Sequence, residues 1–590
     1  MIQSVCGKIL TMNDKMSGNG RLLDSSISRW QSFIRWLFSN PKTDESSIRK
    51  GVRKMSEEKT APAASGKQAA KMLGFGGFFA MTASMVMTVY AYPNFASSGL
   101  HLIFFLILGG IFWFLPVALV AAEMATVKGW EDGGIYAWVG NTLGKRWGFA
   151  ALFYQWFQIT VGFVTMAFFV LAAISYIVGW DALYNNPLVM FIGVAIIVWV
   201  LTLTQLGGTK LTARIAKIGF FGGVLIPAVV LLVGLVAYLA TGGVSQLHFD
   251  AGGIVPDFTK VSTLVIFASF ILAFAGVEAS ASHVNELKNP GKIYPMVMIV
   301  LCILTIVLDT LGGLAVAMTM TEAQLDANLS TGVVVAFANI FDAHFHCGWL
   351  VYVIAFLLAA GVLAEISSWI VGPSRALLET ANEGIIPRSF AKTNKHGVSV
   401  KTVVVQGVIV TIWDAVLCGS MALAGGSGSS ISYLTAVGLT VVIYLVGYVL
   451  FFLAYFKLVF KGKDHARVFQ IFGGTAGKCI VAGLGLILTV FALIVSFFPP
   501  SQLDASSGTV YVITLLICWV ISVAIPFVIY GLRKHWNGGV DHKPPTIASK
   551  KTAAATATAA DAPAPVGKHS IPSPAAGTQD AAPADTPQKE

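Results

Sequence analysis

Acidic residues stand inside long apolar stretches of this chain, where a carboxylate needs a special reason. They are Glu123, Glu278, Asp309, Glu365 and Asp414. A charged acid at the centre of a membrane helix costs roughly 2.5–3.5 kcal/mol on insertion scales. Each acid is therefore expected to bind a proton, a ligand or a neighbouring helix.

Glu278 and Glu365 are the strongest candidates for a functional site. Glu278 follows the small residues of "FAG" (274–276), and Glu365 lies in the middle of "GVLAEISSWIVGPSR" (361–375). If they are buried, both acids can carry protons along a substrate path. A hydrogen bond to a helix end or to another helix is the alternative for each.

The other three acids have simpler explanations. Asp309 and Asp414 stand alone in apolar sequence, which favours buried structural hydrogen bonding. Glu123 lies at the end of an apolar stretch, where it could cap a helix or act at a gate.

Two tyrosines, Tyr444 and Tyr448, are four residues apart and share one helical face. They could line a polar pathway or pack as aromatic side chains with satisfied hydroxyls. The histidines and the six cysteines have no metal-ligand or paired spacing. We therefore expect no metal site and no cofactor. There is also no phosphate-binding loop, so we expect no ATP-driven transport.

The elements that position these residues must be membrane helices. Of the 590 residues, 56% are hydrophobic and only 12% are charged, against about 25% charged in soluble proteins. A spanning helix needs about 20 apolar residues. Twelve stretches qualify, which predicts an all-α polytopic membrane protein: 74–97, 101–126, 148–178, 187–206, 212–240, 261–281, 294–320, 347–371, 401–421, 431–459, 478–498 and 509–531.

The charge distribution orients these spans. Of the 39 Lys and Arg residues, only Lys260 falls in a loop predicted to lie outside. This positive-inside bias places both termini in the cytoplasm. The net charge of +10 follows from that topology and does not argue for nucleic-acid binding.

Two of the spans are expected to be broken helices. The first contains the small residues Ala83 and Ser84 within the segment 83–87, and the sixth contains Ala275 and Gly276 within 274–277. Transporters often bind substrate where matched, discontinuous helices expose backbone groups near the membrane centre. Close helix packing is the alternative for either stretch alone.

The ends of the chain differ from its centre. Residues 1–72 form a basic segment in which 27–38 could be an interfacial amphipathic helix, although translation could start at Met55. Residues 73–531 hold all twelve predicted spans and are the expected transporter domain. If the fold repeats every five helices, the first repeat covers 73–241 and the second 261–460, with added helices at 478–531. The Ala/Pro-rich tail 532–590 is expected to be a disordered cytoplasmic segment.

Three segments resemble signatures of the amino acid–polyamine–organocation superfamily. They are "AAEMATVKGWEDGGIYAWVGNTLGKRWGF" (121–149), "GVEASASHVNELKNPGKIYP" (276–295) and "GPSRALLETANEGIIPRSFAKTNKHG" (372–397). Within this superfamily the chain is most similar to the bacterial branch that exchanges glutamate for γ-aminobutyrate during acid resistance. This closer similarity is carried by "FFAMTASMVMTVYAYPNFASSG" (78–99), "LTQLGGTKLTARIAKIGFF" (203–221), "GVLAEISSWIVGPSR" (361–375) and "LTVVIYL" (439–445), and the resemblance covers most of 73–531.

The resemblance implies a fold of two inverted five-helix repeats, as in LeuT, plus two helices, in the bacterial inner membrane. It implies exchange of external glutamate for internal γ-aminobutyrate, coupled to a cytosolic glutamate decarboxylase that consumes protons. It assigns Tyr90, Glu278, Glu365, Tyr444 and Tyr448 to the substrate path. The broken segments, with Ala83, Ser84, Ala275 and Gly276, would supply backbone groups.

Other functions remain open on the sequence alone. The chain could exchange a different amino acid, such as glutamine, or it could take up such an amino acid together with protons. Ser367 and Ser368 could provide oxygens for a coupling cation in a sodium symporter. A transporter-like receptor that signals through its tails is a further alternative.

Overall fold

The computed structural model describes most of the chain between Gly74 and Trp536. The described ranges are 74–130, 134–206, 215, 218–250, 253–260, 264–280, 287–396, 398–424, 428–462, 465–500, 503 and 505–536. They belong to one structural unit that begins at Lys71. The expectations for the basic segment 1–72, for a start at Met55 and for the tail beyond 536 fall outside these ranges, as does the side chain of Ser84.

The described residues form helices and no strand; an isolated bridge pairs Val127 with Arg467. Among these residues, ten helices are long and apolar enough to cross a membrane. They are α6–η1–α7 (His101–Gly109, Gly110–Phe114, Leu115–Ala125), α9 (Lys145–Val178), α11 (Pro187–Gln205), η2–α13 (Phe220–Leu225, Ile226–Ala240), α16 (Pro290–Thr319), α19 (Gly348–Asn382), α20 (Val400–Ala424), α21 (Gly428–Lys461), α22 (Gly474–Val495) and α23 (Ala505–Trp536). The chain is thus a multi-pass membrane protein.

The two remaining predicted spans, 74–97 and 261–281, contain interrupted helices. In the first, α4 (Phe75–Val86) is followed by a non-helical stretch and by α5 (Tyr92–Ala96). In the second, α15 (Phe267–Phe274) ends before an extended residue. These interruptions lie in the two spans that the sequence predicted to be broken.

The position of the first interruption was predicted wrongly. Residues 83–86 remain helical, because the Met87 N–H still donates to the Ala83 carbonyl at 2.9 Å. Alanine and serine are tolerated in a helix that tertiary contacts support, so their small size alone does not end it. The backbone becomes extended only at Met87, and the next helix begins at Tyr92.

Short helices join the long ones and modify two predicted boundaries. They are α8 (Gly134–Leu143), α10 (Ala182–Asn185), α17 (Glu322–Ala327), α18 (Gly332–Phe337), η5 (Ala338–His344) and η6 (Arg388–Ala391). The consecutive helices α18 and η5 are apolar, although this segment was predicted as a loop. The last helix, α23, continues to Trp536 instead of ending at 531.

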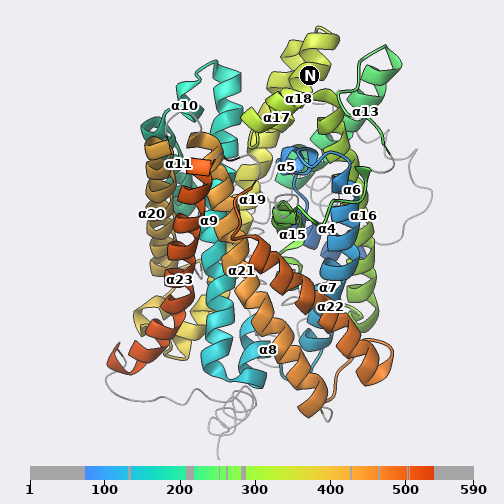
Figure 1. Cartoon of the computed structure of the whole chain (residues 1–590). Coiled ribbons are helices and arrows are strands. Elements are labelled where there is room, and N and C mark those ends of the chain that lie inside the picture. The colour runs from blue at the N-terminus through green and yellow to red at the C-terminus, as the bar shows by residue number, and fades with distance from the viewer. Residues whose placement is uncertain are drawn as a thin grey trace, which may run out of the picture. The chain divides into compact units, whose positions relative to one another are not determined.

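Helix α9 lies at the centre of the described unit. In its most apolar stretch 78% of the residues are buried, against 17% for α23. A helix that is hydrophobic on all sides is buried by its neighbours, and α9 packs against α8, α19 and α21. The interrupted helices α4, α5 and α15 lie between α21 and α16 (Figure 1). The breaks are therefore positioned inside the bundle.

Candidate functional site

Gly276 makes the sharp turn that ends the helical part of the sixth span. Its φ angle of +102° is a conformation that L side chains rarely adopt. A Cβ atom on residue 276 would also lie 2.7 Å from Cη2 of Trp369 in α19. Only glycine satisfies both conditions. The freed Gly276 N–H donates to the hydroxyl of Tyr448 at 3.0 Å.

Glu278 follows this turn and accepts three side-chain hydrogen bonds. The hydroxyls of Tyr444 and Tyr448 donate to its two oxygens, each at 2.5 Å. Gln155 Nε2 donates to Oε1 at 2.8 Å. The carboxylate is 1% exposed, and among the described side chains no ion pair reaches it. Donors from α9 and α21 therefore compensate for its lost hydration.

A pocket lies beside this cluster, between the two interruptions. Its walls come from α5, α9, α15, α19 and α21 and from the residues around the breaks. Four of the predicted residues line it: Tyr90, Ala275, Glu365 and Tyr444. Glu278 and Tyr448 do not line the pocket. They lie behind Tyr444, whose hydroxyl links Glu278 to the pocket wall.

Glu365 is the only carboxylate among the described residues that line this pocket. It comes from α19 and is 8% exposed. It lies close enough to Tyr90 to interact electrostatically, and no described side chain pairs with it as an ion. A buried carboxylate facing a cavity is suited to an ammonium group or to a proton.

Several polar residues of the pocket were missed by the sequence reasoning, among them Asn94, Gln158 and Tyr433. Asn94 Nδ2 donates to the hydroxyl of Tyr433 at 3.0 Å, which joins α5 to α21. Gln158 lines the same pocket, and its Oε1 is buried without a hydrogen-bond partner in the structure. Gln155 and Gln158 both occur in "FYQWFQ" (153–158), inside an apolar span. Two amide side chains so close together in such a span could have identified both residues as candidates for the site.

Of the two predicted residues in α4, the structure leaves Ala83 outside the pocket. Ala83 is buried within α4, its carbonyl accepts from Met87, and it does not line the cavity. Ser84 is helical, and its side chain is outside the described part of the chain. Because α4 continues past both residues, the break that borders the pocket begins later, at 87–91.

The two acids predicted to be structural are both buried. Asp414 in α20 accepts a bond from the Cys418 thiol at 3.4 Å, and its Oδ2 has no partner in the structure. Asp309 in α16 is 4% exposed and lies near Tyr92. Neither residue lines the pocket.

Comparison with known proteins places this architecture in a family. The family model described as amino acid permease matches residues 73–521. The chain belongs to the amino acid permease family.

Individual relatives of this permease are transporters. The chain is 52% identical over 465 residues to the glutamate/gamma-aminobutyrate antiporter of Lactococcus lactis subsp. lactis (strain IL1403), covering 78% of this chain and 91% of that protein. It is 51% identical, with the same coverage, to the antiporter of the same name from Lactococcus lactis subsp. cremoris (strain MG1363). An aspartate/glutamate permease of that cremoris strain is 23% identical, over 74% of this chain and 90% of its own length. The chain is accordingly a transporter and not an enzyme.

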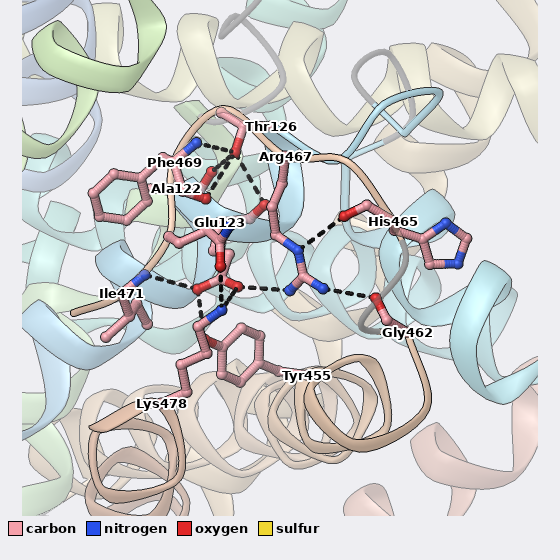
Figure 2. Close-up of polar contacts among 11 residues, drawn as sticks. Ala122, Glu123, Thr126, Tyr455, Gly462, His465, Arg467, Phe469, Ile471 and Lys478 are labelled. Atoms are coloured by element: carbon pink, nitrogen blue, oxygen red, sulfur yellow. Dashed lines mark hydrogen bonds and ion pairs between the residues drawn. The ribbon is translucent and has the colours of Figure 1, made fainter. Parts of the chain in front are cut away.

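A second polar cluster of the permease surrounds Glu123 at the end of α7 (Figure 2). Arg467 Nη1 and Lys478 Nζ lie 2.6 and 2.8 Å from its Oε1. The Tyr455 hydroxyl and the Ile471 N–H donate to Oε2 at 2.8 and 2.9 Å. Glu123 is fully buried, so these contacts replace all of its hydration.

The same cluster anchors the segment between α21 and α22. The remaining Arg467 donors bind the carbonyls of Gly462 and His465, and Lys478 also donates to Gln470. The hydroxyl of Thr126 accepts from the Phe469 N–H at 3.2 Å. Glu123 thus ties α7, α21 and α22 together, and it lies outside the substrate-sized pocket.

Proposed function

We propose that this permease exchanges external glutamate for internal gamma-aminobutyrate by alternating access. The observation that carries the proposal is the 52% identity to a glutamate/gamma-aminobutyrate antiporter over 91% of that protein. The pocket between two interrupted helices is the location where transporters of this architecture hold substrate.

The chemistry of the pocket supports a small zwitterionic substrate. Glu365 offers a negative charge for an ammonium group, while Asn94 and Tyr433 offer amide and hydroxyl groups for a carboxylate. Both proposed substrates carry one ammonium group and at least one carboxylate. Glu278, held by Tyr444, is placed to respond to a substrate through that tyrosine.

We infer twelve spans arranged as two inverted repeats of five, followed by α22 and α23. The first helical element of each half is interrupted, at 87–91 and at 275–276. The third elements, α9 and α19, have similar lengths of 34 and 35 residues and pack against each other. A repeat that pairs first with sixth and third with eighth spans accounts for both observations.

We also infer that both termini are cytoplasmic and that the membrane is the bacterial inner membrane. The positive-inside bias supports this orientation, since Lys260 is the sole basic residue in an outer loop of the twelve-span topology. Gamma-aminobutyrate differs from glutamate by one carboxyl group. A cytosolic glutamate decarboxylase would therefore convert the imported substrate into the exported one, consume a proton and support acid resistance.

The deciding experiment measures exchange in proteoliposomes. We expect labelled glutamate to enter vesicles loaded with gamma-aminobutyrate, and entry to rise with acidification because glutamate then loses negative charge. Empty vesicles are the control. Strong uptake into empty vesicles would contradict exchange and favour a symporter. Unlabelled glutamine and aspartate as counter-substrates determine the specificity.

Glu365→Gln tests the proposed ammonium contact in the same assay. We expect KM to rise about tenfold for both substrates, because a charge-assisted hydrogen bond contributes about 1.5–3 kcal/mol. Glu379→Gln, on the same helix but outside the pocket, is the matched control. An unchanged KM for Glu365→Gln would remove Glu365 from the substrate contacts.

A further inference from the structure

A second cavity, larger than the first, lies on another side of α9. It has a volume of about 520 Å³, within the range of roughly 300–1,000 Å³ that is typical of ligand pockets. Phe153, Trp156 and Phe157 of α9 form its floor. Ile409 of α20 and Ile525 of α23 form opposite walls. The polar groups of the lining are the Thr402 hydroxyl and the indole N–H groups of three tryptophans, of which those of Trp413 and Trp536 already donate to Thr160 and Ile385. We call this cavity the α20–α23 pocket.

The α20–α23 pocket opens toward the bilayer. Helices α20 and α23 both pack on α9, and residues of all three helices line the pocket. Ile412 and Ile521, which line it, are 57% and 55% exposed. Residues with such exposure on membrane helices face lipid. A ligand can therefore enter sideways from the membrane.

The depth of the pocket corresponds to one leaflet. It extends along α20 from Thr402, near the start of the helix, to Trp413. At 1.5 Å per residue this distance is about 16 Å, close to half of the roughly 30 Å hydrocarbon core. The end of this opening nearest the helix termini, called the mouth here, is bordered by Trp536 at the end of α23 and by Phe149 near the start of α9.

Basic residues surround this mouth. Arg388 lies between the lining residues Pro387 and Phe390, and Lys401 precedes the lining residue Thr402; both basic side chains are exposed. The other cations at the described helix ends are Arg146, Lys392, Arg533 and Lys534. The described acids of these ends are Glu379 and Glu383, and Glu383 already binds Tyr136 and Lys145. The rim is therefore positive.

We propose that the α20–α23 pocket binds an acyl chain of an anionic phospholipid, whose headgroup phosphate lies against Arg388 and Lys401. A water-soluble ligand would find almost no hydrogen-bond partner inside the pocket. A peptide would leave its backbone groups unsatisfied there. An acyl chain has no such groups, and each basic residue near the surface attracts an anionic headgroup.

The position of the pocket gives the lipid a route to the substrate site, a consequence that rests on the proposed function. Trp156 and Phe157 line the α20–α23 pocket, while their neighbours Gln155 and Gln158 contact Glu278 and the substrate pocket. Trp413 also donates to Thr160 of α9 at 3.1 Å. A lipid that fills the pocket therefore supports the face of α9 opposite the substrate.

The binding test uses the purified full-length chain in nanodiscs that contain phosphatidylglycerol or phosphatidylcholine with identical chains. After transfer to detergent, the phospholipid retained per protein is measured by mass spectrometry. We expect several-fold greater retention of phosphatidylglycerol. The double variant Arg388→Gln/Lys401→Gln should weaken its retention roughly thirtyfold, from about 1 kcal/mol per basic residue, and leave phosphatidylcholine unchanged. Equal retention of the two lipids by the wild type would overturn the proposal.

A pocket-filling variant tests the acyl site independently of charge. Ile409→Trp should abolish retention of both lipids, whereas Ile487→Trp, at a 66% exposed position on α22 outside the pocket, should not. Equal retention by these two variants would refute the acyl site. The double glutamine variant changes only exposed side chains. Its lipid retention therefore still tests the proposal if the Ile409→Trp variant does not fold.

Exchange assays then separate the lipid site from the transport function. In vesicles, wild-type exchange should increase with the fraction of phosphatidylglycerol, and the double glutamine variant should lose this dependence. Selective retention without any exchange would leave the lipid site standing and remove the proposed function. Exchange that is independent of lipid charge would overturn the coupling between the two sites.

Discussion

At the scale of single residues, Glu278 is the centre of the polar interior. Its two oxygens accept from Tyr444, Tyr448 and Gln155, so α9 and α21 converge on the turn at Gly276. An acid in an apolar helix needs such partners, because a buried carboxylate without donors or a cation is strongly unfavourable. Its role as a proton carrier or as a positioning group stays a prediction.

We expect Glu278→Gln to reduce exchange at least tenfold and to change its pH profile. The glutamine amide would present donors where three donors now converge, and lost charge-assisted bonds contribute about 1.5–3 kcal/mol each. Exchange rates measured across pH check this. Asp309→Asn, another buried acid that does not line the pocket, is the matched control. A pH profile identical to the wild type would leave Glu278 with a packing role only.

At the scale of elements, the interrupted helices depend on one backbone conformation. Gly276→Ala should abolish most exchange and lower the thermal unfolding midpoint, because strained backbone conformations cost about 1–3 kcal/mol and the added methyl group meets Trp369. Gly419→Ala in α20, where a Cβ meets nothing within 4 Å, should be neutral or stabilising. Differential scanning fluorimetry and exchange assays compare the two variants.

Removing Trp369 separates the two causes of this effect. In Gly276→Ala/Trp369→Ala the steric contact is gone, but the positive φ angle still disfavours alanine. The double variant should therefore remain impaired. Full recovery of exchange and of the unfolding midpoint would mean that the contact with Trp369 alone requires glycine.

The Glu123 cluster connects three long helices, and its loss should be asymmetric. Glu123→Gln leaves Arg467 and Lys478 buried without a carboxylate, which costs about 3–5 kcal/mol for a buried pair. Lys478→Met should cost clearly less, since Arg467 still neutralises Glu123. Chemical denaturation of the detergent-solubilised protein measures both. Equal costs would show that the two cations contribute independently of the carboxylate.

At the scale of the whole molecule, the described residues that line the pocket all lie between Val86 and Tyr444. Deletion of residues 1–54 and 543–590 should leave glutamate/gamma-aminobutyrate exchange within about twofold of the full chain, because no described pocket residue lies in either segment. Proteoliposomes with matched protein content check this. Loss of exchange in the truncated chain would assign the tails a part in transport and revive the receptor alternative.

Much of the site could be predicted from the chain itself. The acids Glu278 and Glu365 are conspicuous in apolar helices, and Tyr444 and Tyr448 share a face at a spacing of four residues. Asn94, Gln158 and Tyr433 were missed, because an isolated polar residue in a membrane helix is ordinary until a cavity is found beside it. The first interruption was placed too early, since residue size does not determine where a helix ends.

The sequence by itself determined the class of the molecule: its hydropathy requires membrane helices, because a bilayer leaves backbone groups no other partners. It also indicated the two spans that are interrupted. Only the tertiary structure decided which acids meet donors and which face a cavity. Glu278, Glu365 and Glu123 look alike in their apolar contexts, yet one is held by tyrosines, one lines the pocket and one binds two cations. Those differences come from helices far apart in sequence, which local patterns do not encode.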